Sequence, residues 1–216
     1  DNQDAAFERV YRRLYKVQYP LDRVGRQRLE KVRPTLQRYA EQIELDWLNL
    51  AALAFKESTL NPAARGAGGA TGLMQVTPEA GRDTAKRFGV SYDWSRMVSD
   101  PVYNTQMGAA ELSALLAEYR GCHIMTFAGY NAGRGRVRDW IKAYGDPRDP
   151  KVDPVDWVER IPISETRNYV QRVMENFVVY RARFEDAGTA IAAKSGERVV
   201  TQETNAAPAG AAIPSQ

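Results

Sequence analysis

Glu57 is the residue whose position in this sequence most directly suggests acid-base chemistry. It follows Ile43 to Lys56, a stretch of aromatic and aliphatic residues with almost no polar face, and a helix that is apolar all round is a buried one. A carboxyl group at the end of such a helix is removed from water and lies near the partial negative charge of the helix C-terminus. Both effects raise its pKa, as a general acid working near neutral pH requires. The alternative is an ordinary glutamate in a surface turn with Ser58.

Glu165 and Tyr169 form a second candidate pair, in a helix predicted to open at Ser164 and to run to about Phe184. Their spacing of four residues places both side chains on one face of that helix. An acid in the first turn is also favoured by the helix dipole, so a capping role for Glu165 is the alternative. Tyr169 could equally be a core tyrosine with a satisfied hydroxyl.

A glycine-rich segment, residues 58–77, follows Glu57 directly and is predicted to be a loop. Four glycines and Pro62 interrupt any regular pattern there, which implies sharp bends or close approach to the backbone. Loops of this length in compact domains are usually functional or disordered.

The other elements are predicted to be helices, and no convincing alternation of period two appears, so the fold is predicted to be all-α. Thr77 before Pro78 and Asp100 before Pro101 are cap and first-turn pairs that begin helices. Apolar spacing predicts further helices over residues 4–17, 27–42, 121–130, 134–144 and 154–160. From residue 187 the absence of aromatic residues and the abundance of Ala, Gly, Ser, Thr and Pro predict a disordered tail of low complexity.

The composition of the 216 residues excludes several classes of protein. Hydrophobic residues make up 44% of the chain, enough for a packed core, yet no apolar run approaches the roughly 18 residues of a membrane span. The 30 Lys and Arg against 27 Asp and Glu leave a net charge of +3, too weak to indicate nucleic acid binding. The single cysteine, Cys122, and the single histidine, His123, are a poor zinc set, so neither a metal nor a cofactor is expected.

Three separated runs resemble the catalytic domain of the soluble lytic transglycosylases, lysozyme-like enzymes that cut bacterial peptidoglycan. They are AFKESTLNPAARGAGGATGLMQVTP from Ala54, GYNAGRGRVRDW from Gly129 and IPISETRNYV from Ile161, in the order of the family. The resemblance covers about Leu45 to Phe184 and implies a lysozyme-like fold of the goose type. It implies an amphipathic helical linker over residues 1–44, a catalytic domain over 45–186 and a tail over 187–216.

Carried over position by position, the resemblance implies that Glu57 is the single catalytic acid and base. Ser58 would hold the Glu57 carboxyl or the loop by a hydrogen bond, and Met74 and Gln75 would lie at the sugar-binding cleft. The further substrate-binding residues that it implies are Tyr130, close to the catalytic carboxyl, Asn131, Glu165, whose role is to orient, and Tyr169.

Two positions depart from the pattern of the family. Gly66 stands where the family usually has a serine that contacts an N-acetyl group, and Gly129 stands where alanine is common. Loss of one hydroxyl should weaken a sugar contact by roughly 0.5 to 1.5 kcal/mol without abolishing chemistry.

The activity implied is cleavage of the β-1,4 bond between N-acetylmuramic acid and N-acetylglucosamine without water, closing a 1,6-anhydro ring. Glycan strands would be the partner and the periplasm the location, with an export signal either removed or outside this fragment. Two other interpretations stay open. One is a goose-type lysozyme-like hydrolase, and the other is a peptidoglycan-binding or remodelling accessory module of a secretion or cell-wall assembly.

Overall fold

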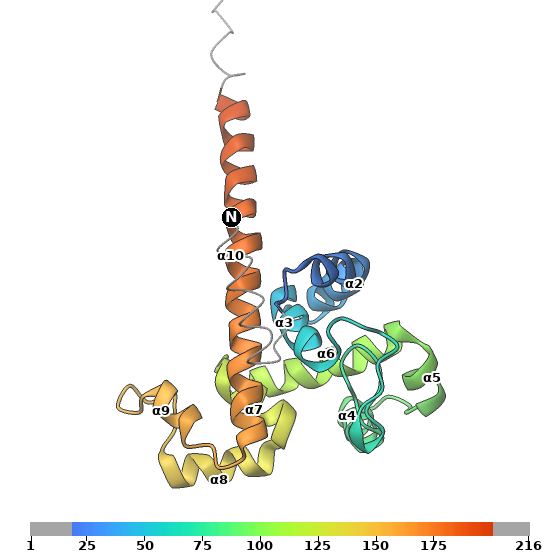
Figure 1. The fold of residues 1–216 in the computed structure, drawn as a ribbon, viewed down its shortest axis with the longest axis vertical. Coiled ribbons are helices and arrows are strands. Elements are labelled where there is room, and N and C mark those ends of the chain that lie inside the picture. Colours follow the sequence, from blue (N-terminus) through green and yellow to red (C-terminus); the bar gives the residue numbers. More distant parts are fainter. Residues whose placement is uncertain (1–18, 201–216) are drawn as a thin grey trace, which may run out of the picture. The chain divides into compact units, whose positions relative to one another are not determined.

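The computed structural model describes residues 19–200, and side chains as far as residue 184. The chain divides into two compact units between Tyr180 and Arg181, a point within the long last helix of Figure 1. The predicted helix over residues 4–17 lies outside the described residues. The helices are α2 (Arg23–Gln42), α3 (Trp47–Ser58), α4 (Pro78–Phe88), α5 (Trp94–Ser99), α6 (Pro101–Glu118), α7 (His123–Ala132), α8 (Arg134–Tyr144), α9 (Pro154–Glu159) and α10 (Ser164–Val200), with a short 3-10 turn, η1 (Ala67–Gly69).

The all-α prediction is confirmed for residues 19–200, where the extended pairings are two isolated bridges, Arg65 with Thr71 and Thr71 with Val76. Both bridges lie in the segment predicted to be a glycine-rich loop. Among these residues no helix is long and apolar enough to cross a membrane.

Helix α3 is the buried centre of the first unit. The Asp46 side chain caps it by accepting a hydrogen bond from the Leu48 backbone N–H at 2.9 Å. Leu50 to Ala54 have no exposed surface, as expected for a helix that is apolar all round. The helix stops at Thr59, which adopts a left-handed conformation with φ of 52°. Because α3 ends at Ser58, Glu57 lies in its last turn.

Helix α2 packs against α3 and α6, so the segment expected to be a linker contributes to the core. Leu29 and Leu36 on its inner face are buried, and the Arg28 guanidinium donates to the Thr59 hydroxyl at 2.7 Å. The helix begins at Arg23, earlier than predicted, because the Asp22 side chain accepts from the Gly25 N–H at 2.6 Å and supplies an N-cap. The predicted boundary at residue 44 therefore does not separate a linker from the folded unit.

The loop between α3 and α4 is held by a buried asparagine on α6. The Asn104 side chain accepts from the Met74 N–H at 3.2 Å and donates to the Thr71 carbonyl at 2.8 Å. A Cβ atom at Gly72 would lie 2.4 Å from Asn104, and Gly72 has φ of 77°, so glycine is required where the loop meets α6. Helix α4 then begins as predicted, with the Thr77 hydroxyl accepting from the Ala80 N–H at 3.2 Å.

Helix α10 adds the last wall of the first unit. The Asn176 side chain donates to the Ala52 carbonyl of α3 at 3.3 Å, and Val173 is fully buried. The helix continues through Val200, whereas the sequence predicted an irregular tail from residue 187. Alanine and charged residues with good helix propensity extend it, and the first proline of that region is Pro208. Residues 201–216 of the predicted tail lie outside the described residues.

Candidate active site

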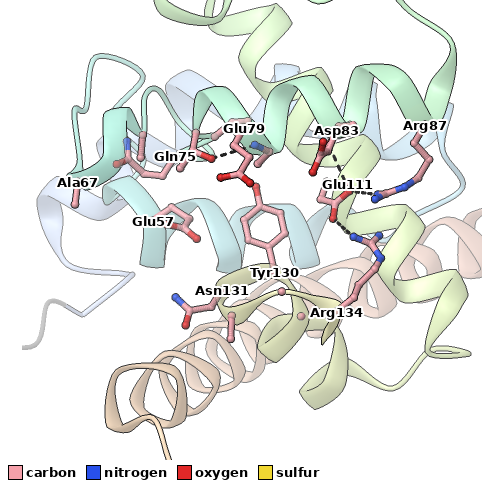
Figure 2. Close-up of a pocket in the computed structure, with 18 of the residues that line it drawn as sticks. Glu57, Ala67, Gln75, Glu79, Asp83, Arg87, Glu111, Tyr130, Asn131 and Arg134 are labelled. Carbon is pink, nitrogen blue, oxygen red and sulfur yellow. Dashed lines mark hydrogen bonds and ion pairs between the residues drawn. The ribbon is translucent and has the colours of Figure 1, made fainter. Parts of the chain in front are cut away.

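A groove of about 800 Å³ opens on the first unit beside the end of α3 (Figure 2). Its volume is within the range usual for ligand pockets. Its walls are formed by the loop after α3, one face of α4, Glu111 of α6, the junction of α7 and α8, and the first turn of α10. The charged side chains that line it are Glu57, Glu79, Asp83, Arg87, Glu111, Arg134 and Glu165.

Glu57 lines one part of this groove, and burial raises its pKa from 4.5 to about 7. A hydrogen bond from Tyr169 and the positive charge of Lys56 act in the opposite direction, but desolvation is the larger effect. The carboxyl group is therefore balanced between its protonated and ionised forms near neutral pH. Such a group can deliver a proton in one step and accept one in the next.

Tyr169 of α10 is the direct partner of this carboxyl group. Its hydroxyl donates to Glu57 Oε1 at 2.5 Å. Burial, followed by the nearby Glu57 charge, raises the pKa of Tyr169 well above 10, so the phenol remains a donor. The Lys56 ammonium lies over the Tyr169 ring, 5.1 Å from its centre, in a cation–π contact.

Tyr130, expected close to the catalytic carboxyl group, lines the groove, and its hydroxyl is hydrogen-bonded to the loop after α3. It donates to the Met74 carbonyl at 3.0 Å. Burial and then the Glu57 charge raise the pKa of Tyr130 well above 10, so this hydroxyl also stays protonated. Tyr130 thus anchors the loop of Met74, whereas Tyr169 donates the hydrogen bond to the Glu57 carboxyl group.

Ser58 and Met74 were expected among the residues that contact substrate, and the structure buries both. The Ser58 hydroxyl donates to the Leu73 carbonyl at 2.9 Å, so of its two expected roles it has the one of holding the loop. The Met74 side chain has no exposed surface and packs against Gly108. A direct sugar contact by the Met74 side chain was therefore a wrong expectation, because α6 covers that side chain.

Gln75 does line the groove, in a left-handed conformation with φ of 48°. Its side-chain amide donates to the Gly72 carbonyl at 2.9 Å. A Cβ atom at Gly66 would lie only 2.2 Å from Gln75 Oε1. The far end of the flexible Gln75 side chain thus occupies the space that a Cβ atom at position 66 would enter, and it would have to shift to admit one.

Asn131 and Glu165 line the groove from α7 and from the first turn of α10. The Asn131 side-chain oxygen accepts from the Thr166 hydroxyl at 2.7 Å, and this bond joins the two helices at the groove. Glu165 is exposed there, whereas Tyr169, on the same helix face, is buried.

A charged cluster that the sequence did not predict lies on the other side of Tyr130 from Glu57 (Figure 2). Both oxygens of the Glu111 carboxylate are used, one by Arg87 and the other by Arg134. Two signals pointed to it: Glu79, Asp83 and Arg87 are spaced by four residues along α4, and Arg134 lies within the second of the three runs. Groups of three or more side chains able to hold a metal ion are absent from the described residues.

Comparison with known proteins agrees with the motifs. The family profile described as "Transglycosylase SLT domain" matches residues 34–152. The soluble lytic murein transglycosylase of Escherichia coli K12 is 35% identical over 157 residues, which cover 72% of this chain and 24% of that protein.

Solved structures give the same relationship. An inactive mutant of the lytic transglycosylase Slt from Pseudomonas aeruginosa superposes with a TM-score of 0.61 at 34% identity, covering 71% of this chain and 24% of that one. A 70-kDa soluble lytic transglycosylase in complex with bulgecin A has a TM-score of 0.66 at 32% identity, covering 74% of this chain and 26% of that one. The chain thus spans about a quarter of the length of these relatives, and it belongs to the lytic murein transglycosylase family that carries the SLT domain.

Proposed function

We propose that the first unit cleaves the β-1,4 bond between N-acetylmuramic acid and N-acetylglucosamine in peptidoglycan, leaving 1,6-anhydro-muramic ends. The observation that carries this proposal is the Glu57 carboxyl group, whose pKa burial raises to about 7, in a groove of a chain that belongs to the SLT family. The catalytic domain in this proposal is residues 45–186 together with α2. The periplasm is the proposed location, because its substrate lies there.

In the first step Glu57, protonated, gives its proton to the glycosidic oxygen as the bond from that oxygen to C1 of muramic acid breaks. The electron pair of the bond leaves with N-acetylglucosamine, and the oxocarbenium-like C1 is captured by the oxygen of the muramic N-acetyl group. Desolvation of Glu57 favours this step, because it keeps the proton on the carboxyl group until the leaving oxygen needs it.

In the second step the C6 hydroxyl of the same sugar attacks C1 and displaces the N-acetyl oxygen. Glu57, now ionised, takes the proton of that hydroxyl and returns to its starting form. The C6 hydroxyl is tethered to the ring, so its effective concentration can far exceed that of a loosely held water. No second carboxylate is needed to hold a nucleophile.

Neighbouring side chains have supporting roles in this proposal. Tyr169 stabilises the ionised Glu57 between the two steps through its 2.5 Å hydrogen bond. Gln75, Asn131 and Glu165 contact the glycan from the groove walls, and Tyr130 holds the Met74 loop. Ser58 and Met74 position the groove through their burial.

The test is Glu57→Gln, which keeps the size of the side chain and removes its titrating proton. Turnover of purified peptidoglycan should fall by at least about 10²-fold while glycan binding persists. Glu30→Gln, at an exposed position of α2, is the matched control and should retain full turnover. Turnover of Glu57→Gln near that of the wild type would refute the assignment.

A further inference from the structure

Tyr169 of α10 is contacted at two points by consecutive residues of α3. Its hydroxyl donates to Glu57 Oε1 at 2.5 Å, and the Lys56 ammonium lies over its ring, 5.1 Å from the ring centre. Successive side chains of a helix point about 100° apart, so neighbouring residues reach different parts of the same partner. The last turn of α3 therefore meets this phenol with a positive charge at the ring and an acceptor at the hydroxyl.

The contact between Lys56 and Tyr169 is favourable for both side chains. Among the described residues the Lys56 ammonium has no ion pair with a carboxylate, so its charge is not neutralised by one. Tyr169 is only 3% exposed, and a cation is attracted more strongly to a ring that is removed from water than to an exposed one. A cation over the ring restrains its position and draws electron density from it, which makes the hydroxyl a better donor.

Other titratable groups face the groove together with Glu57. Tyr130 lines it from α7, and Glu165 lines it from the first turn of α10. The remaining charged side chains on its walls are Glu79, Asp83, Arg87, Glu111 and Arg134. Burial raises the pKa of Glu57, and the two groups that act against burial are Tyr169, by its hydrogen bond, and Lys56, by its charge. Both groups that favour the ionised carboxyl thus belong to one contact.

We infer that Lys56 is a positioning residue, whose ammonium holds the Tyr169 phenol in place as the donor to Glu57 and so eases the change of Glu57 from proton donor to proton acceptor. This inference rests on the proposed function, in which Glu57 makes that change between the two steps. Without the ammonium the phenol is less restrained and donates less well, so the ionised carboxyl group is less stabilised. Glu57 then keeps its proton to higher pH.

The test is a titration of Glu57 that needs no substrate. Its carboxyl carbon is followed by NMR in protein labelled with carbon-13 glutamate, and the signal is assigned by its loss in Glu57→Gln. Lys56→Met keeps a long side chain without the charge, and the pKa of Glu57 should rise by at least about 0.3 in this variant. Lys56→Arg keeps a cation for the ring and should leave that pKa within about 0.1 of the wild type. Lys142→Met, exposed on α8 and outside the groove, is the matched control and should leave it unchanged.

The same titration in the Tyr169→Phe background shows whether Lys56 acts through the phenol. This background retains the ring and lacks the hydroxyl, so adding Lys56→Met should raise the pKa of Glu57 by less than half as much as in the wild type. A rise at least as large in this background would show that Lys56 acts by its charge alone, and no rise in either would show that the contact has no effect. Either result would overturn the inference. Failure of the wild type to cleave peptidoglycan would refute the proposed function separately and leave the titrations standing.

Discussion

Replacing Glu57 by glutamine should change how the free energy of unfolding depends on pH, and the size of the change follows from the site. Burial raises the pKa of Glu57 from 4.5 in a solvated chain to about 7 in the folded protein. Between these values the folded protein retains a proton that the unfolded chain has released, so stability falls as pH rises. At 1.36 kcal/mol per pH unit, the total loss is about 3 kcal/mol.

The sign distinguishes this carboxyl group from an ordinary surface acid. Because the folded-state pKa is raised, the contribution of Glu57 to stability is fully present below 4.5 and is lost above about 7. The Glu57→Gln variant has no titrating proton at this position. Its free energy of unfolding, relative to that of the wild type, should therefore rise by about 3 kcal/mol across the same window.

Urea unfolding of both proteins from about pH 4 to about pH 8 measures this difference, and other titrating groups cancel in it. Glu30→Gln, at an exposed position of α2, controls for the loss of one negative charge. A pH-independent difference for Glu57→Gln would contradict the raised pKa, since it would mean that the folded Glu57 carboxyl titrates like a solvated one.

Two further substitutions test the walls of the site. Tyr169→Phe removes the hydrogen bond that favours ionised Glu57, so the pKa of Glu57 should rise further. The falling limb of the pH-rate profile, where Glu57 loses the proton that the first step needs, should then move to higher pH, and an unchanged profile would show that the bond does not act on catalysis. In Gly66→Ala the new methyl group meets only the flexible end of the Gln75 side chain, so the free energy of unfolding should change by less than about 1 kcal/mol and KM should rise. In Gly72→Ala the backbone has φ of 77° and the new methyl group would lie 2.4 Å from Asn104, so the fold should be destabilised by more than about 2 kcal/mol. Denaturant unfolding that ranks the two glycine variants the other way would contradict this account of the loop.

Local signals in the sequence predicted much of the fold. The buried helix that ends at Glu57, the cap at Thr77 and the cap at Asp100 involve residues a few positions apart, and the structure contains each of them. The sequence did not reveal that the segment expected to be a linker, residues 1–44, contributes to the core, because the amphipathic face of α2 does not specify which helices cover it. The answer, α3 and α6, depends on packing of segments distant in sequence.

The site was predictable where a motif carries its residues and less so where contacts are long-range. Glu57, Gln75 and Tyr130, each in a motif, line the groove, but the hydrogen bond between Tyr169 and Glu57 joins residues 112 positions apart. Glu111 lies 24 positions from Arg87 and 23 from Arg134, and nothing local distinguishes it from a solvated glutamate on α6. Met74 belongs to a motif, but the motif did not reveal that α6 covers its side chain.

If Glu57 drives cleavage without water, the products take up no oxygen from the solvent, and isotope labelling of the solvent measures this. Peptidoglycan is digested by the full chain in water enriched in heavy oxygen, and the muropeptides are weighed by mass spectrometry before and after borohydride treatment. We expect muramic ends that are one water lighter than hydrolysis products, carry no heavy oxygen and resist borohydride. Reducible muramic ends that contain heavy oxygen would contradict cleavage without water and identify a lysozyme-like hydrolase.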